Sequence, residues 1–133
     1  MSNHSKVGPL RAALVVVGII FIVGVYPLTI LWPSGWIWHM SGHSTYLQMI
    51  LGIYATLGVF LLLAARDPLK NLSLIWFTVW SSIVHGGIMA VQSLVYPEHR
   101  GHLLGDVPAL LLIAIVLAAL TPRGGETRAQ ASA

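Results

Sequence analysis

The chain has 133 residues, of which 56% are hydrophobic and only 8% charged, and its formal net charge at pH 7 is +3. An ordinary soluble domain carries about 25% charged residues, so this composition excludes that class. It also excludes a disordered chain, which is polar and rich in charge. We therefore predict a single integral membrane domain. The sequence contains no cysteine, which excludes disulfides, thiolate metal sites and a cysteine nucleophile.

Four apolar stretches are each long enough to cross a bilayer, which takes about 20 helical residues. They cover approximately residues 10–31, 45–65, 69–95 and 103–120. Proline and glycine lie between them and end helices. The first stretch is too long for the apolar part of a signal peptide, so we expect it to be retained. The predicted fold is all-α: an up-down, four-helix transmembrane bundle over residues 1–121, followed by a disordered cytoplasmic tail at 122–133.

Basic residues are distributed unequally between the two sides of this bundle. If the N-terminus is inside, the outside segments contain only Arg100. The inside segments contain the other basic residues, which are Lys6, Arg11, Arg66, Lys70, Arg123 and Arg128. The positive-inside rule then places both termini in the cytoplasm. Trp36 and Trp38 fall in the first outside loop, where tryptophans commonly anchor a helix at the interface. No basic patch supports nucleic-acid binding.

The third stretch has one polar face. Successive helical residues advance by about 100°, and the residues within about 60° of His85 include most of the polar side chains of this helix. They are Thr78, Ser81, Ser82, Met89, Gln92 and Tyr96. Trp76, Trp80, Ala90 and Leu94 point the other way. An ionisable side chain within a membrane span normally faces the bundle interior, so we expect His85 to point inward in the outer half of the membrane.

Most histidines fall in the same outer half. Five of the six do so, namely His39, His43, His85, His99 and His102. His102 and Asp106 have the i, i+4 spacing that puts two side chains on one helical face. Gly101 interrupts the register before them, so His99 joins that face only if the helix continues through the glycine. His43 begins the second stretch and shares its face with Tyr54.

These residues predict a polar site composed of His43, His85, Gln92, His102 and Asp106. One interpretation is a transition-metal or haem site with His85, His102 and Asp106 as ligands, because imidazoles and carboxylates bind zinc, copper and iron. Gly86 and Gly87 would leave room for a porphyrin. The other interpretation is a structural hydrogen bond from His85 to Asp106, Gln92 or Tyr46.

Two further functions remain open. The chain could be a non-catalytic accessory or assembly subunit of a larger membrane complex, or a homo-oligomer, because its loops are short. It could also be a small enzyme acting on a lipid-soluble substrate, with His85 and Asp106 as acid and base. That reaction requires both groups to reach the same substrate proton. In every case the chain is surrounded by membrane lipid.

Residues 73–92 (SLIWFTVWSSIVHGGIMAVQ) and 102–109 (HLLGDVPA) carry a resemblance to known proteins. This part of the chain resembles small bacterial four-span integral membrane proteins grouped as a family of unknown function. The resemblance covers approximately residues 46–120. It implies a multi-pass protein of the bacterial inner membrane, and it implies no activity, cofactor or site.

Overall fold

The computed structural model describes residues 3–38 and 44–123, and this part of the chain contains helices and no strands. Four helical segments are long and apolar enough to cross a membrane: Ser5–Leu31, Thr45–Ala64, Pro68–Val95 and Pro97–Leu120. The predicted all-helical fold with four apolar spans is confirmed. His43 and most of the predicted tail, residues 124–133, lie outside the described residues.

The first span is not one regular helix. It consists of α1 (Asn3–Ile19), a π-helical turn η1 (Ile20–Gly24) and α2 (Val25–Leu31). It therefore begins before residue 10, where the apolar stretch starts. A π-turn widens the helix locally and is often found beside functional sites. A short helix, α3 (Pro33–Trp36), follows in the segment predicted as a loop.

The remaining spans are α4 (Thr45–Ala64), α5 (Leu72–Val95) and α6 (Asp106–Leu120). Ser44 caps α4, because its hydroxyl accepts the backbone N–H of Leu47 at 3.1 Å. Two 3₁₀ turns, η2 (Pro68–Asn71) and η3 (Pro97–Leu103), precede α5 and α6. The predicted helix over residues 103–120 is thus interrupted, since η3 ends at Leu103 and α6 begins at Asp106.

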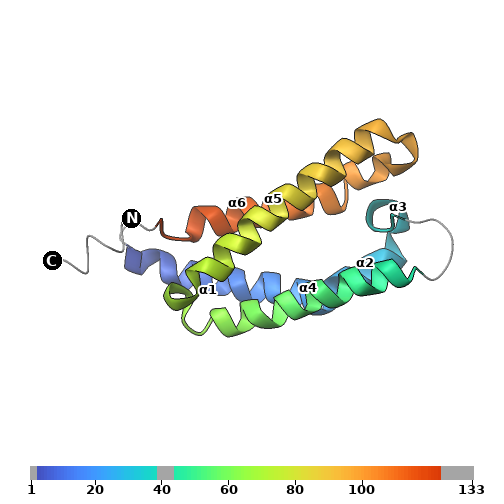
Figure 1. Ribbon diagram of the computed structural model, residues 1–133. Coiled ribbons are helices and arrows are strands. Elements are labelled where there is room, and N and C mark those ends of the chain that lie inside the picture. Colours follow the sequence, from blue (N-terminus) through green and yellow to red (C-terminus); the bar gives the residue numbers. More distant parts are fainter. Residues whose placement is uncertain (1–2, 39–43, 124–133) are drawn as a thin grey trace.

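Successive long helices run in opposite directions, so α1 begins and α6 ends at the same end of the bundle (Figure 1). We call the opposite end, which carries α3 and η3, the α3 end. The first span packs along α4, and α5 packs along α6. The two pairs diverge toward the α3 end (Figure 1). This divergence separates α4 from α5 at the level of the polar site.

The core lies where the two pairs are close together. Leu10, Leu14, Leu61, Ile75 and Leu117 are fully buried there. Gly18 and Gly58 place the backbones of α1 and α4 in contact: a Cβ added at Gly58 would lie 2.6 Å from the carbonyl oxygen of Gly18. Small residues at such crossings are typical of membrane helix pairs.

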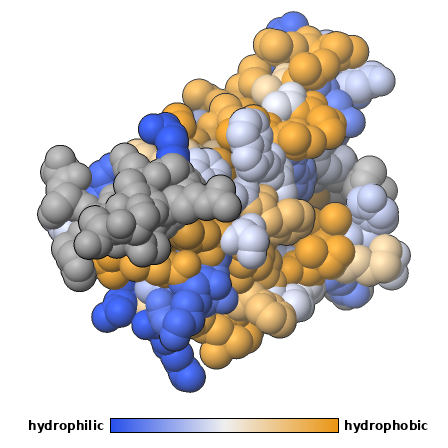
Figure 2. All heavy atoms as spheres, turned by 60° about the vertical axis from the view of Figure 1, so that its left-hand side comes forward, coloured by the Kyte–Doolittle hydropathy of each residue, from blue (hydrophilic) through white to orange (hydrophobic). Residues whose placement is uncertain are grey.

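The polar face predicted for α5 is largely turned inward. Thr78, Ser82 and Met89 are buried, while Trp80 and Leu94 are exposed. Trp76 and Ala90, expected on the outward side, are instead partly buried against the core. The Thr78 hydroxyl donates to the carbonyl of Leu74 at 2.9 Å in the helix itself. Exposed apolar side chains therefore face outward, and Figure 2 shows them over much of the flank of the molecule. Such a surface is suited to lipid.

Candidate functional site: a histidine–aspartate network beside a cavity

His102 and Asp106 form a buried pair at the α3 end. The imidazole Nδ1 of His102 lies 3.0 Å from each carboxylate oxygen of Asp106. His102 is 1% exposed and Asp106 is 7% exposed. Asp106 is the first residue of α6, where a carboxylate interacts favourably with the helix dipole. The i, i+4 pair expected from the sequence is present, although η3 and α6 are separate helices.

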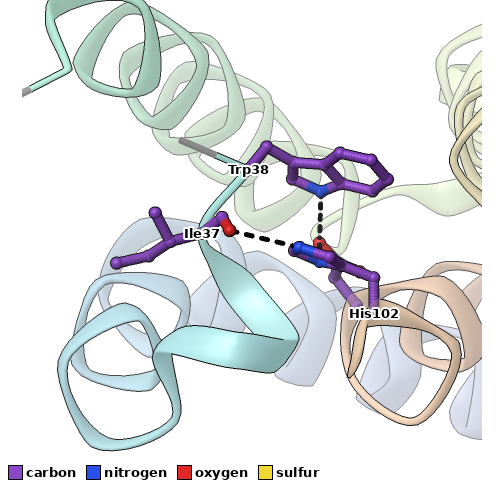
Figure 3. A network of polar contacts seen from close by, with 4 residues as sticks. Ile37, Trp38 and His102 are labelled. Atoms are coloured by element: carbon purple, nitrogen blue, oxygen red, sulfur yellow. Dashed lines mark hydrogen bonds and ion pairs between the residues drawn. The ribbon is translucent and has the colours of Figure 1, made fainter. Parts of the chain in front are cut away.

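The segment after α3 completes this network (Figure 3). The indole Nε1 of Trp38 donates to Asp106 Oδ2 at 3.0 Å, and the Nε2 of His102 lies 3.1 Å from the carbonyl oxygen of Ile37. The ring of Trp38 also stacks on that of His102, with centroids 4.0 Å apart. We call Ile37, Trp38, His102 and Asp106 the His102 network. It attaches the segment between the first two spans to the start of α6.

Two glycines bring the backbones of this region into contact. A Cβ added at Gly101 would overlap the backbone carbonyl of Ser34, and one added at Gly105 would overlap that of Gly35. Neither position has room for a larger side chain without backbone movement. Glycine at 101 and 105 is therefore required for α3 to lie against η3.

Both ring nitrogens of His102 already have hydrogen-bond partners within the protein. The carbonyl of Ile37 accepts only, so Nε2 carries a proton. Nδ1 either donates to the Asp106 carboxylate or accepts from its protonated form, and no lone pair remains for a metal in either arrangement. In the described part of the chain, no three His, Cys, Asp or Glu side chains form a group that could hold a metal. The donor set predicted from His85, His102 and Asp106 does not fit a metal or haem.

His85 lies on α5 with a different partner from those considered in the sequence. The Tyr54 hydroxyl from α4 is hydrogen-bonded to the Nδ1 of His85, so the expected bond to Asp106, Gln92 or Tyr46 is not formed. Tyr54 in turn meets the edge of Phe21, with ring centroids 4.9 Å apart. Phe21 belongs to the π-turn η1. The irregular turn of the first span thus supports the tyrosine that orients His85.

Two adjoining cavities surround His85. The larger has a volume of about 430 Å³, and the smaller has about 110 Å³. Both are lined by Trp38, Leu47, Ile50, His85 and Met89. Every span contributes to the wall of the smaller cavity, including Phe21, Tyr54 and Ala109. His85 therefore lies where the two cavities adjoin.

The larger cavity opens on the flank of the bundle. Its wall includes Tyr46 from α4 and Ile88 from α5, which are 62% and 55% exposed. These two side chains lie on helices that face lipid, so the opening is lateral. Polar groups of Gln92, Tyr96 and His99 line the same cavity toward the α3 end.

The predicted site residues thus separate into two groups. His85 lines both cavities, Gln92 lines only the larger, and Asp106 lines only the smaller. His102 lines neither cavity and is hydrogen-bonded within the His102 network instead, to Asp106 and Ile37. Sequence reasoning missed Tyr54 and Trp38 as site residues. Tyr54 was placed on the face of His43, and Trp38 was expected to anchor the helix at the interface, although its indole reaches Asp106.

A family model covers nearly the whole chain, matching residues 5–133, and the chain belongs to that family, a family of unknown function (DUF6632). No curated protein and no solved structure matches the chain.

Proposed function

We propose that this member of the DUF6632 family binds a lipid-soluble molecule carrying a hydrogen-bond acceptor, in the two cavities beside His85. The observation that supports this function is the environment of one atom, the Nε2 of His85. Among the described residues it has no hydrogen-bond partner, although Nδ1 of the same ring does. An oriented, unpartnered imidazole nitrogen at the wall of a cavity is a natural contact for a bound molecule.

The hydrogen bond at Nδ1 determines whether the Nε2 of His85 carries the proton of the ring and can donate it to a ligand. The hydroxyl of Tyr54 has one proton to donate, and its one partner in the described structure is Nδ1. When Tyr54 donates that proton, the neutral imidazole carries its own proton on Nε2. The ring then presents an N–H to the cavity. The matching group on a ligand is an acceptor, such as the carbonyl oxygen of an ester, amide or quinone.

The shape of the site favours an elongated, amphipathic molecule. Gln92 follows His85 by seven residues on α5, which corresponds to about 10 Å along the helix axis. A ligand polar at one end can contact Gln92 and His99 near the α3 end and place its acceptor at His85. Its apolar part then fills the smaller cavity, among side chains such as Ile50 and Leu110. The lateral opening beside Tyr46 and Ile88 gives such a molecule a route from the bilayer.

The His102 network has a positioning role in this function. Ile37 and Trp38 form part of the wall of the larger cavity, and the network fixes both through His102 and Asp106. Both carboxylate oxygens of Asp106 are already hydrogen-bonded. We therefore propose binding at His85 in preference to acid–base catalysis by His85 and Asp106.

The orientation in the membrane is also a proposal. Lys6, Arg11, Arg66, Lys70 and Arg123 belong to the segments at the end where α1 begins, and Arg100 belongs to the α3 end. By the positive-inside rule, the bundle lies with both termini in the cytoplasm. The binding site then opens in the outer half of the plasma membrane, as the resemblance to bacterial inner-membrane proteins implies.

Extraction of the bound molecule tests this function. The wild type, His85→Ala and Val84→Ala are purified gently from the same membrane, and extracted lipids are compared by mass spectrometry, with elemental analysis in parallel. Val84 is the neighbouring lipid-facing control, at 58% exposed. We expect one carbonyl-bearing, lipid-soluble molecule enriched in the wild type and in Val84→Ala, and lost in His85→Ala. An unchanged lipid set in His85→Ala contradicts the proposal. A stoichiometric metal would favour a cofactor, and a specific larger protein without an enriched lipid would favour an accessory subunit.

A further inference from the structure

We propose a second binding site, at the end of the bundle opposite α3, in which Arg11 and Arg66 bind the phosphate of an anionic phospholipid. It shares no residue with the cavities and does not depend on the function proposed for them. Arg11 lies on α1 and Arg66 in the turn after α4, and a hydrogen bond joins the two residues. The Nη2 of Arg11 donates to the backbone carbonyl of Arg66 at 3.3 Å.

This contact places the guanidinium group of Arg11 beside the backbone of Arg66. Arg11 lies on α1, and Arg66 directly follows Ala65, the C-cap residue of α4. Both residues are exposed. The bond to the carbonyl uses one N–H of Arg11, so the other guanidinium N–H groups remain available for phosphate oxygens. Guanidinium groups bind phosphate well because their planar array of donors matches the oxygens.

The neighbouring carboxylate does not neutralise the arginines. Asp67 is paired with Lys70, whose Nζ lies 3.0 Å from Oδ2. The hydrogen bond from Lys70 holds the pKa of Asp67 below its ordinary value, and the charge of Arg11 acts in the same direction. Asp67 is thus a carboxylate at neutral pH with a lysine of its own. In the described part of the chain, neither Arg11 nor Arg66 has a carboxylate partner, and the loop retains excess positive charge.

The position of Arg11 and Arg66 relative to the apolar spans favours the phosphate of a lipid over inorganic phosphate as the ligand. Arg66 lies between two candidate spans, Thr45–Ala64 and Pro68–Val95, and headgroups lie at the ends of such spans in a bilayer. Leu69 is 43% exposed beside Lys70, so apolar surface adjoins the cations. Figure 2, with this end brought forward, shows hydrophilic side chains gathered next to apolar ones. Basic groups at the ends of membrane helices are recognised binding sites for anionic headgroups.

Binding of defined lipids to the full chain tests this site. The protein in neutral detergent is titrated with dioleoyl phosphatidylglycerol, dioleoyl phosphatidylcholine or inorganic phosphate, with native mass spectrometry and melting temperature as readouts. We expect saturable binding of phosphatidylglycerol alone. Each change, Arg11→Gln or Arg66→Gln, should weaken it about fivefold, since one basic group near an anionic surface contributes about 1 kcal/mol. Arg66→Lys should retain most of the binding.

Arg100→Gln, at the α3 end, is the matched control and should bind like the wild type. Equal binding of phosphatidylglycerol in Arg11→Gln, Arg66→Gln and Arg100→Gln would overturn the proposal. Inorganic phosphate binding as tightly as the lipid would overturn the assignment of the ligand as a phospholipid. Because His85→Ala leaves this site intact, phosphatidylglycerol binding should persist in that variant whatever becomes of the cavity ligand.

Discussion

Tyr54 and His85 belong to different membrane-spanning helices, and the hydrogen bond between the Tyr54 hydroxyl and the imidazole Nδ1 orients the histidine between two cavities. The bond matters because α4 and α5 diverge toward the α3 end (Figure 1), and it joins the two helices beside the cavities. It also determines which nitrogen is left for a ligand. The proposed function depends on this pair more than on any other contact.

Removal of the Tyr54 hydroxyl should weaken ligand binding without unfolding the protein. In Tyr54→Phe the aromatic contact with Phe21 is kept, but the imidazole of His85 loses the group that fixes its orientation. A neutral hydrogen bond contributes about 1 kcal/mol, so we expect about fivefold weaker retention of the co-purified molecule. Tyr26→Phe is the control, because Tyr26 is 62% exposed. Equal retention in the two variants would argue against a role for the hydroxyl.

Loss of Asp106 should destabilise the fold strongly. Asp106→Ala leaves His102 and the Trp38 indole buried without their shared acceptor. Breaking a buried pair of this kind costs about 3–5 kcal/mol, which should lower the melting temperature in detergent markedly. Asp67→Ala removes an exposed carboxylate paired with Lys70 and should change the melting temperature little. Similar melting temperatures for the two variants would show that the His102 network does not hold the α3 end.

The two glycines that contact α3 should not tolerate alanine. In Gly101→Ala and Gly105→Ala the new methyl group would overlap the backbone of Ser34 or Gly35, so the melting temperature should fall. Gly52→Ala is the matched control, since a Cβ there meets nothing within 4 Å. Alanine in an exposed helix position is favoured over glycine by about 0.5–1 kcal/mol, so this variant should be slightly stabilised. Stabilisation of all three variants would show that α3 does not lie against η3.

A larger side chain in the smaller cavity should exclude the ligand while preserving the fold. Ala109 lines that cavity from α6, and Ala109→Leu would occupy part of its volume of about 110 Å³. We expect loss of the co-purified molecule with an unchanged or raised melting temperature, because added apolar contacts replace empty space. Ala119→Leu, at an exposed position of the same helix, should retain the molecule. Retention in Ala109→Leu would place the ligand outside the smaller cavity.

The sequence predicted the membrane spans well because their signal is local. Hydrophobic length and flanking prolines located α4 within a residue of its observed bounds. The periodicity of α5 likewise predicted that Thr78 and Ser82 face the interior. The π-turn at Ile20–Gly24 was not predictable, because its residues continue the apolar stretch and Gly24 alone does not distinguish a π-turn from a regular helical turn.

The site was only partly predictable, because its partners are distant in the sequence. His102 and Asp106 are four residues apart, and their spacing alone indicated the pair. Tyr54 and His85 are 31 residues apart, and Trp38 and Asp106 are 68 apart. Such contacts depend on how the helices pack, and helical periodicity does not determine packing. The carbonyl of Ile37 is also distant from His102 in the sequence, so the spacing of His102 and Asp106 did not indicate that both nitrogens of the ring have protein partners.

The protonated nitrogen of His85 can be measured directly, and it distinguishes a lipid ligand from a metal. In protein labelled with ¹⁵N-histidine, chemical shifts distinguish a ring nitrogen that carries a proton from one that does not, and His85→Ala identifies the signals of this ring. We expect that Nδ1 is unprotonated and accepts from Tyr54, and that Nε2 is protonated and its signal shifts when the co-purified molecule is removed. A proton on Nδ1 with a bare Nε2 would contradict this expectation, because His85 would then offer the cavity a lone pair suited to a metal instead of a donor for a carbonyl oxygen.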